Sequence, residues 1–152
     1  MAQTNSAFAS VGAAIEYATD GGTTWNDMAG TTVRVVPSGG ERMTGERFTL
    51  DGDTGIITIG KRATFSVALT LLDENATSGT YADFLAYYES GGLFRVRWSP
   101  AGGTTGDLQN TSDANYSYIT AFPYGAADAE EAAAQAVEVT MVMATITQAA
   151  VA

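Results

Sequence analysis

The clearest structural signal in the chain lies in Ala63-Thr-Phe-Ser-Val-Ala-Leu-Thr-Leu-Leu72. From Phe65 to Leu71 every second residue is large and apolar, and the residues between them are Ser, Ala or Thr. Successive side chains of a β-strand point to opposite faces of a sheet. The alternation therefore predicts a long strand with one buried face.

Strand patterns recur on both sides of this segment, separated by turn residues. We predict strands at residues 11–17, 31–36, 93–98, 116–122 and 137–147. Pro37 is expected to end the second of these, and residues 101–115 are expected to form a loop. Residues 46–59 have the pattern of a hairpin whose turn is Asp51-Gly-Asp-Thr-Gly55.

One segment changes to a helical period. Between residues 80 and 89, apolar side chains follow the spacing i, i+3, i+4 and i+7 that places them on one helix face. Thr80 and Asp83 have the spacing of a capping box, and Gly91-Gly92 supplies a stop. We predict one short amphipathic helix here.

Seven or eight strands with one helix predict a mainly β protein, an antiparallel β-sandwich or barrel with one short flanking α-helix. Residues 1–152 are expected to form a single domain. Within it, residues 1–12 lack charge and periodicity and are expected to form an extended N-terminal arm. Residues 126–136 are predicted as a helical turn or a loop.

Composition excludes several classes of function. The chain has no Cys and no His, which removes thiolate zinc sites and the commonest general base and metal ligand. With 7 basic and 17 acidic residues the net charge is −10, which disfavours binding to a phosphate backbone. No spacing selects a catalytic carboxylate pair or a Ser nucleophile, so we expect no enzymatic activity, no metal and no cofactor.

Two further features concern location and assembly. The chain shows no apolar run of ~20 residues and no signal-peptide pattern at its start, so we expect cytoplasmic synthesis and no membrane binding. Only 16% of its residues are charged, whereas about 25% is typical of soluble domains. A surface covered by further copies needs fewer charges than a free one, so this composition favours self-assembly.

Asp20-Gly21-Gly22-Thr-Thr24-Trp25 is similar to an Asp-box, a motif in which Asp and Gly shape a tight turn and Thr and Trp pack against it. We predict a structural turn rather than a sugar site, because sugar-binding propellers carry several copies. Asp51 and Asp53 resemble the start of a calcium loop, but Arg62 stands where the bidentate Glu is required. Arg95 and Arg97 share a strand face and are candidates for intersubunit contacts, since arginine pairs well with carboxylates.

The order of these elements resembles that of the tail tube (major tail) proteins of long-tailed bacteriophages and gene transfer agents. The resemblance begins at Ile15-Glu-Tyr-Ala-Thr-Asp-Gly-Gly-Thr-Thr-Trp25, continues through the strand at 65–71 and the helix at 81–89, and includes Phe94-Arg-Val-Arg-Trp-Ser-Pro100. It implies a β-sandwich or barrel whose copies form a ring, usually a hexamer, with the inner strands joined into one barrel.

The same resemblance implies rings stacked into a hollow tube in the virion tail. The implied partners are a tape-measure protein, tail tip and terminator proteins, and DNA that passes through without specific binding. Synthesis would be in the host cytoplasm. Because DNA must slide through, an acidic wall is preferable to a basic one, and we expect part of the chain's carboxylates to face the bore.

The segment 37–61 resembles the long loop that stacks one tail tube ring on the next. Its charged residues are the candidates for inter-ring contacts: Glu41, Arg42, Glu46, Arg47, Asp51 and Asp53. An ordinary surface hairpin is the alternative.

Two other functions are open at this point. One is a carbohydrate- or receptor-binding β-sandwich module that exposes Tyr116, Tyr118 and Tyr124. The other is a ring protein of the same machine that does not stack, such as a tail terminator or head–tail joining protein.

Overall fold

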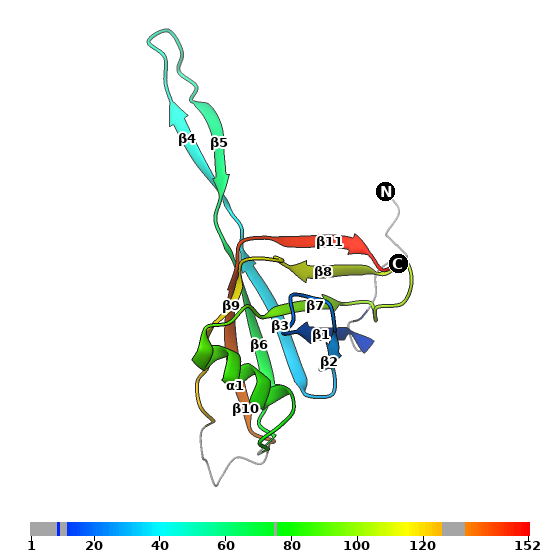
Figure 1. Cartoon of the computed structure of the whole chain (residues 1–152). Helices are drawn as coiled ribbons and strands as arrows, with labels where there is room; N and C mark the ends of the chain where they lie inside the picture. Colours follow the sequence, from blue (N-terminus) through cyan, green and yellow to red (C-terminus); the bar gives the residue numbers. More distant parts are fainter. Residues whose placement is uncertain (1–8, 10–11, 75, 126–132) are drawn as a thin grey trace.

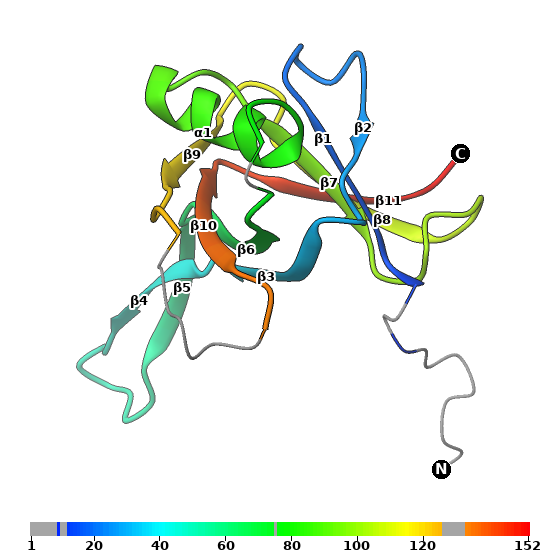
Figure 2. The same cartoon turned by 90° about the horizontal axis from the view of Figure 1, so that it is seen from below.

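A computed structural model of the chain describes residues 9, 12–74, 76–125 and 133–152. Two antiparallel sheets enclose one core, one helix covers an open side of it, and a two-stranded hairpin projects away from both sheets (Figures 1 and 2). The mainly β prediction with one flanking helix is confirmed.

The first sheet has five strands in the order β11-β8-β7-β1-β2. Their bounds are β1 Ala14–Ala18, β2 Asn26–Asp27, β7 Arg95–Ser99, β8 Leu108–Ser112 and β11 Ile146–Ala150. The second sheet has four strands in the order β3-β6-β10-β9. Their bounds are β3 Thr32–Gly39, β6 Phe65–Leu72, β9 Ser117–Ala121 and β10 Ala136–Met143. Strands β4 Arg42–Arg47 and β5 Ile56–Arg62 pair only with each other.

Strand β6 organises the core. Its alternate residues Val67, Leu69 and Leu71 are fully buried, as the period of two predicts. On the neighbouring β10, Val139 and Met141 stand opposite Leu69 and Val67 and are also fully buried. The five-stranded sheet closes this core from the other side with the buried side chains Ile15, Tyr17, Val96 and Trp98.

The helix α1, Thr80–Ser90, brings an aromatic cluster to the open side of the sandwich. The Phe84 ring lies 4.4 Å from that of Phe94 on the chain leading into β7, and Phe94 stacks on Tyr17 at 5.4 Å. Gly91 ends the helix in the left-handed conformation, at φ 69°, which glycine adopts without a Cβ clash.

The predicted capping box is wrong. The N-cap of α1 is Gly79, which has no side chain to cap with, and Thr80 is a buried residue inside the helix. Glu74 supplies the missing acceptor, because its carboxylate takes a hydrogen bond from the N–H of Tyr81. The carboxylate of Asp83 accepts the Tyr17 hydroxyl at 2.5 Å instead of closing a box.

Three strand predictions also need correction. The expected loop at 101–115 contains β8, which β7 and β11 hold on either side although it lacks apolar alternation. The expected last strand at 137–147 is two strands, because the chain bends after Met143 and passes from one sheet to the other. Strand β3 continues through Pro37 to Gly39; it is an edge strand, where a missing N–H costs no ladder bond. Most of the predicted arm at 1–12 and of the segment 126–136 lies outside the described residues.

Removing the Phe94 ring should test the aromatic cluster. We expect Phe94→Ala to lower the free energy of unfolding by about 3–5 kcal/mol, because the ring is fully buried against three other aromatic rings. Tyr116→Ala, at a side chain 63% exposed, is the control and should change it by no more than about 0.5 kcal/mol. Urea denaturation measures both, and equal losses would contradict this account of the core.

Candidate assembly surfaces

Among the described strands, β4 and β5 of the hairpin pair only with each other. Every described residue from Glu41 to Thr64 is exposed apart from Gly55, which is half-buried. The hairpin carries large apolar side chains in solvent, among them Phe48 at 64% and Leu50 at 110% exposure. The others are Met43, Ile56, Ile57 and Ile59. An isolated two-stranded ribbon is marginally stable in water, and exposed apolar groups of this number are typical of protein contacts.

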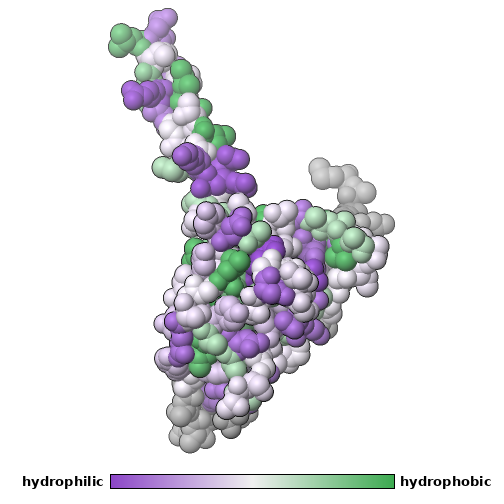
Figure 3. Space-filling model, in the orientation of Figure 1, coloured by the Kyte–Doolittle hydropathy of each residue, from purple (hydrophilic) through white to green (hydrophobic). Residues whose placement is uncertain are grey.

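All six predicted stacking residues lie on this hairpin. Arg42, Glu46 and Arg47 are on β4, Glu41 precedes it, and Asp51 and Asp53 are in the turn. Figure 3 shows hydrophilic and hydrophobic residues interspersed along the projection. The structure thus places these candidates on one exposed projection; their contact with another ring stays a prediction.

The four-stranded sheet has two unpaired edges. Strand β3 pairs only with β6, and strand β9 pairs only with β10. Phe94 contacts the start of β9, where its backbone N–H donates to the carbonyl of Ser117. Along the rest of each outer edge no described strand pairs with the backbone N–H and C=O groups, and such an edge is a template for pairing with another chain. The five-stranded sheet is less open at one side, since its edge strand β2 has two residues; its other edge is β11.

An apolar groove of about 560 Å³ runs beside the β3 edge. Its lining includes Ile15 from β1, Trp98 from β7, and Val33, Val35 and Pro37 from β3. No sequence pattern indicated this groove, because it lies between segments far apart in the chain. An apolar surface beside an open strand edge is typical of a site that another protein surface covers.

The outer face of the four-stranded sheet carries mostly small side chains and few charged ones. The residues that alternate with the buried ones point to this face. They are Arg34, Val36, Ser38, Ser66, Ala68, Thr70, Glu138, Thr140, Val142, Tyr118 and Thr120. One cation and one anion leave the face with no net charge.

Residues Asp20 to Trp25 form a hydrogen-bonded turn. The Asp20 carboxylate accepts the backbone N–H groups of Thr24 and Thr23, each at 3.0 Å, and Gly21 and Gly22 adopt positive φ. The hydrogen bonds from Thr24 are the main reason why the pKa of Asp20 is lowered. The turn places Trp25 against the arginines of β7.

Arg95 and Arg97 already have partners within the chain. Their guanidinium groups lie 5.4 and 4.3 Å from the centroid of the Trp25 ring, within cation–π range. Arg97 also pairs with Glu16, and Arg95 donates hydrogen bonds to the carbonyls of Gly21 and Ser112. These contacts hold β7 against the turn at 20–25, so both arginine side chains have a structural role within a single copy. Their contact with a neighbouring copy stays a prediction.

Tyr17 on β1 is buried and donates its hydroxyl to Asp83 on α1, a contact that no sequence pattern indicated. Loss of hydration and the hydrogen bond to Asp83 raise the pKa of its hydroxyl to about 12. This pair joins β1 to α1 inside the aromatic cluster. It serves the packing of the helix and faces no groove, so we assign it no chemical role.

The remaining features of the described residues concern metal binding, membrane crossing and the exposed tyrosines. Among them, no group of three acidic side chains is placed to hold a metal ion, and no helix is long and apolar enough to cross a membrane. Tyr116 and Tyr124 are exposed, and the side chain of Tyr118 is 37% exposed. Tyr124 contacts Phe122, and the Tyr118 hydroxyl bonds the carbonyl of Asn115. Among the described residues, no ring contact joins Tyr116, Tyr118 and Tyr124 to one another.

Comparison with known proteins identifies the fold. No protein-family model matches the chain, and no curated protein matches it by sequence. Among solved structures, a chain of the 6-fold symmetrised anti-feeding prophage baseplate superposes with a TM-score of 0.70 at 11% identity, covering 99% of each chain. A chain from the tail of an empty gene transfer agent particle, refined with C6 symmetry, gives 0.63 at 15% identity, covering 99% and 100%.

The SPP1 tail tube gives a TM-score of 0.62 at 10% identity, covering 91% of this chain and 76% of that one. The likeness to tail tube proteins predicted from the sequence is therefore confirmed for the fold. At these identities the match shows the fold, and the function has to be argued from the surfaces.

Removing the hairpin should leave the fold intact. Gly40 and Thr64 already face each other through a 3.1 Å backbone hydrogen bond, so Asn-Gly in place of residues 41–63 closes a tight turn between β3 and β6. We expect the free energy of unfolding of the isolated chain to change by no more than about 0.5 kcal/mol, because the hairpin residues are exposed and pair with no other described strand. Urea denaturation measures it; a loss of about 3 kcal/mol or more would show that the hairpin stabilises the body.

Proposed function

We propose that this protein is a structural subunit of a tail tube, which assembles into rings that stack into a hollow tube. One observation carries the proposal: a fold shared with tail tube proteins leaves open two strand edges and an unsupported apolar hairpin, surfaces that only other copies would cover. The chemistry is assembly rather than catalysis.

The ring would form through the edges of the four-stranded sheet. If β9 of one copy pairs with β3 of the next, both edges gain hydrogen bonds and the sheet continues from copy to copy. A closed ring removes every free edge, as a β-barrel does. We propose six copies, in line with the 6-fold symmetry of two similar structures. The groove beside β3 would be covered by the adjoining copy.

The hairpin would join one ring to the next. It projects beyond both sheets, so it reaches outside the ring that its own copy forms (Figure 1). Contact with another ring would bury Phe48 and Leu50 and bring Glu41, Arg42, Glu46, Arg47, Asp51 and Asp53 near opposite charges. The alternative is a tail terminator or joining protein that forms one ring without stacking. Electron microscopy of the purified protein separates the two, because a tube subunit forms tubes whereas the alternative forms single rings.

A bore lined by the four-stranded sheet would differ from the acidic wall expected from the composition. If the four-stranded sheet faces inward, each copy lines the bore with Ser, Thr, Ala, Val and Tyr residues, one Arg and one Glu. A lining without net charge offers no cation cluster to hold phosphates, so DNA would pass without specific binding. The net charge of −10 per copy then resides mainly on other surfaces.

The proposal implies a place in the virion tail, after synthesis in the host cytoplasm. A tape-measure protein would occupy the bore during assembly, and tip and terminator proteins would bind the two ends of the tube. The rival function, carbohydrate or receptor binding, has less support, because no ring contact joins the three exposed tyrosines among the described residues.

Cysteine cross-linking tests the ring directly, because the natural chain has no cysteine. We expect chains with one cysteine on each edge, Ser38→Cys on β3 with Thr120→Cys on β9, to form a disulfide ladder under oxidation. In a closed ring the ladder should end at the hexamer, as read on non-reducing gels. Neighbouring positions, Val36→Cys and Tyr118→Cys, cover a shift in register.

The matched control carries Ser38→Cys alone. One cysteine per chain cannot extend a ladder, so this variant should give nothing larger than a dimer. Double variants that also stop at the dimer, at every tested register, would reject pairing of β3 with β9.

A further inference from the structure

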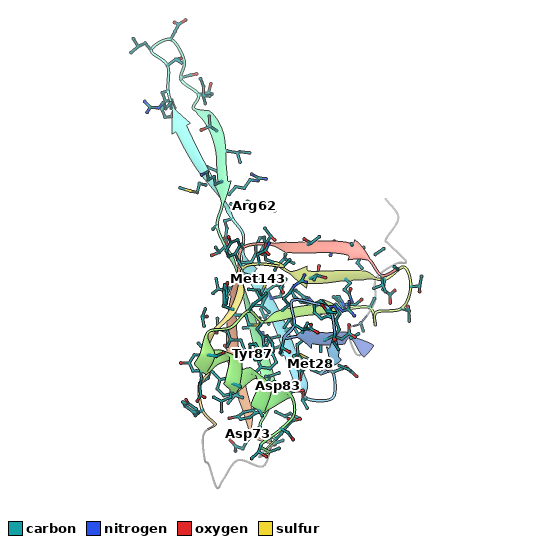
Figure 4. The ribbon with its side chains drawn as sticks, viewed as in Figure 1. Met28, Arg62, Asp73, Asp83, Tyr87 and Met143 are labelled. Carbon is teal, nitrogen blue, oxygen red and sulfur yellow. The ribbon has the colours of Figure 1, made fainter. Side chains whose placement is uncertain are left out.

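The base of the hairpin is basic in a chain that is otherwise acidic. Arg42, Lys61 and Arg62 are three of the seven cations, and all three are exposed. Arg62 lies where the hairpin joins the body, and the same junction forms a hydrophilic band (Figures 3 and 4). Together these three residues are named the basic base.

The basic base is poorly compensated within its own copy. Arg42 stands directly opposite Arg62 in the β4–β5 register, an arrangement in which like charges repel. Arg42 donates a hydrogen bond to the carbonyl of Gly60, which is neutral. Among the described residues the salt bridge found is Arg97 to Glu16, in the other sheet. Glu41 is the nearest acidic residue in sequence, and with it the net charge of this region is still +2.

The opposite end of the same sheet is acidic. Strand β6 leads from the basic base to Asp73 and Glu74, a span of eight residues or roughly 25 Å of extended chain. Glu138 on β10 is paired with Thr70 on β6, so it lies near the same end of the sheet, and it is exposed. Figure 4 shows Arg62 and Asp73 at the two ends of the four-stranded sheet. Glu74 and Glu138 together are named the acidic end.

We infer that the basic base of one copy binds the acidic end of a copy in the next ring. This inference rests on the proposed function and names the partner of the stacking surface. A contact between two different surfaces of the same protein is heterologous and continues without closing, which is what a tube requires. Because like ends repel, it also gives every ring the same direction along the tube.

The inference adds residues that the sequence did not select. The six predicted stacking candidates all lie within residues 41–53. They do not include Lys61, Arg62, Glu74 or Glu138. The apolar hairpin would supply contact area, and the two charged ends would supply register and direction. Stacking should therefore weaken as salt increases, since exposed charge pairs are screened over about 8–10 Å.

Charge reversal with rescue tests the inference. The first variant carries Lys61→Glu and Arg62→Glu, with a net charge of −14 from −10 since each reversal changes the charge by two. The second carries Glu74→Lys and Glu138→Lys, with a net charge of −6. The third combines all four and returns to −10. Negative-stain microscopy and sedimentation measure rings and tubes, and thermal denaturation verifies folding of each variant.

We expect the first and second variants to form rings but to need at least about tenfold more protein to form tubes. The combined variant should return to within about threefold of the natural chain, because attraction is restored with the signs exchanged. Glu138→Lys paired with Glu89→Lys is the control for Glu74, whose carboxylate also bonds the N–H of Tyr81. This control keeps Glu74 and the same net charge of −6, and it should stack better than the second variant.

The possible outcomes distinguish failure of the pairing between the charged ends from failure of the proposed function. Tubes that form equally well from all variants, or a combined variant that fails to stack although it folds and forms rings, overturn the pairing of the two ends. A natural chain that forms neither rings nor tubes overturns the proposed function itself.

Discussion

Backbone pairing in the four-stranded sheet is the constraint on which the rest of the structure depends. The central strands β6 and β10 have a partner on each side and fill the core with their alternate residues. The outer strands β3 and β9 have a partner on one side only, so their other backbone groups require water or another chain. A sheet that continues from copy to copy satisfies both edges without any change of fold.

The low charge of the chain follows from the same constraint. A free monomer would expose the groove beside β3, the outer sheet face and the apolar side chains of the hairpin. In a stacked tube, neighbouring copies would cover much of this surface, and the charges would be needed only on the parts that stay exposed. Arg95 and Arg97 are charges with a role inside each copy, because they contact Trp25 and so hold the turn at 20–25.

Periodicity in the sequence predicted the elements that pack on the core. Strand β6 and helix α1 were found because burial of one face imposes a period on the residues themselves. Strand β8 was missed, since its neighbours in the sheet hold Leu108–Ser112 in place. The predicted capping box is wrong because Glu74, which precedes the helix and lies outside the capping-box spacing, accepts the N–H of Tyr81. The hairpin and its charges were predicted, whereas the groove and the acidic end depend on how separate segments meet.

The central claim is that copies of this chain meet edge to edge through the four-stranded sheet. A cryo-electron microscopy reconstruction of the protein at high concentration, with a tail-tip initiator if needed, tests it most directly. The account predicts stacked rings in which β9 of each copy is hydrogen-bonded to β3 of its neighbour, with each hairpin lying on the adjacent ring. A particle that stays monomeric, or copies joined through β11 with β3 and β9 left in solvent, would contradict it.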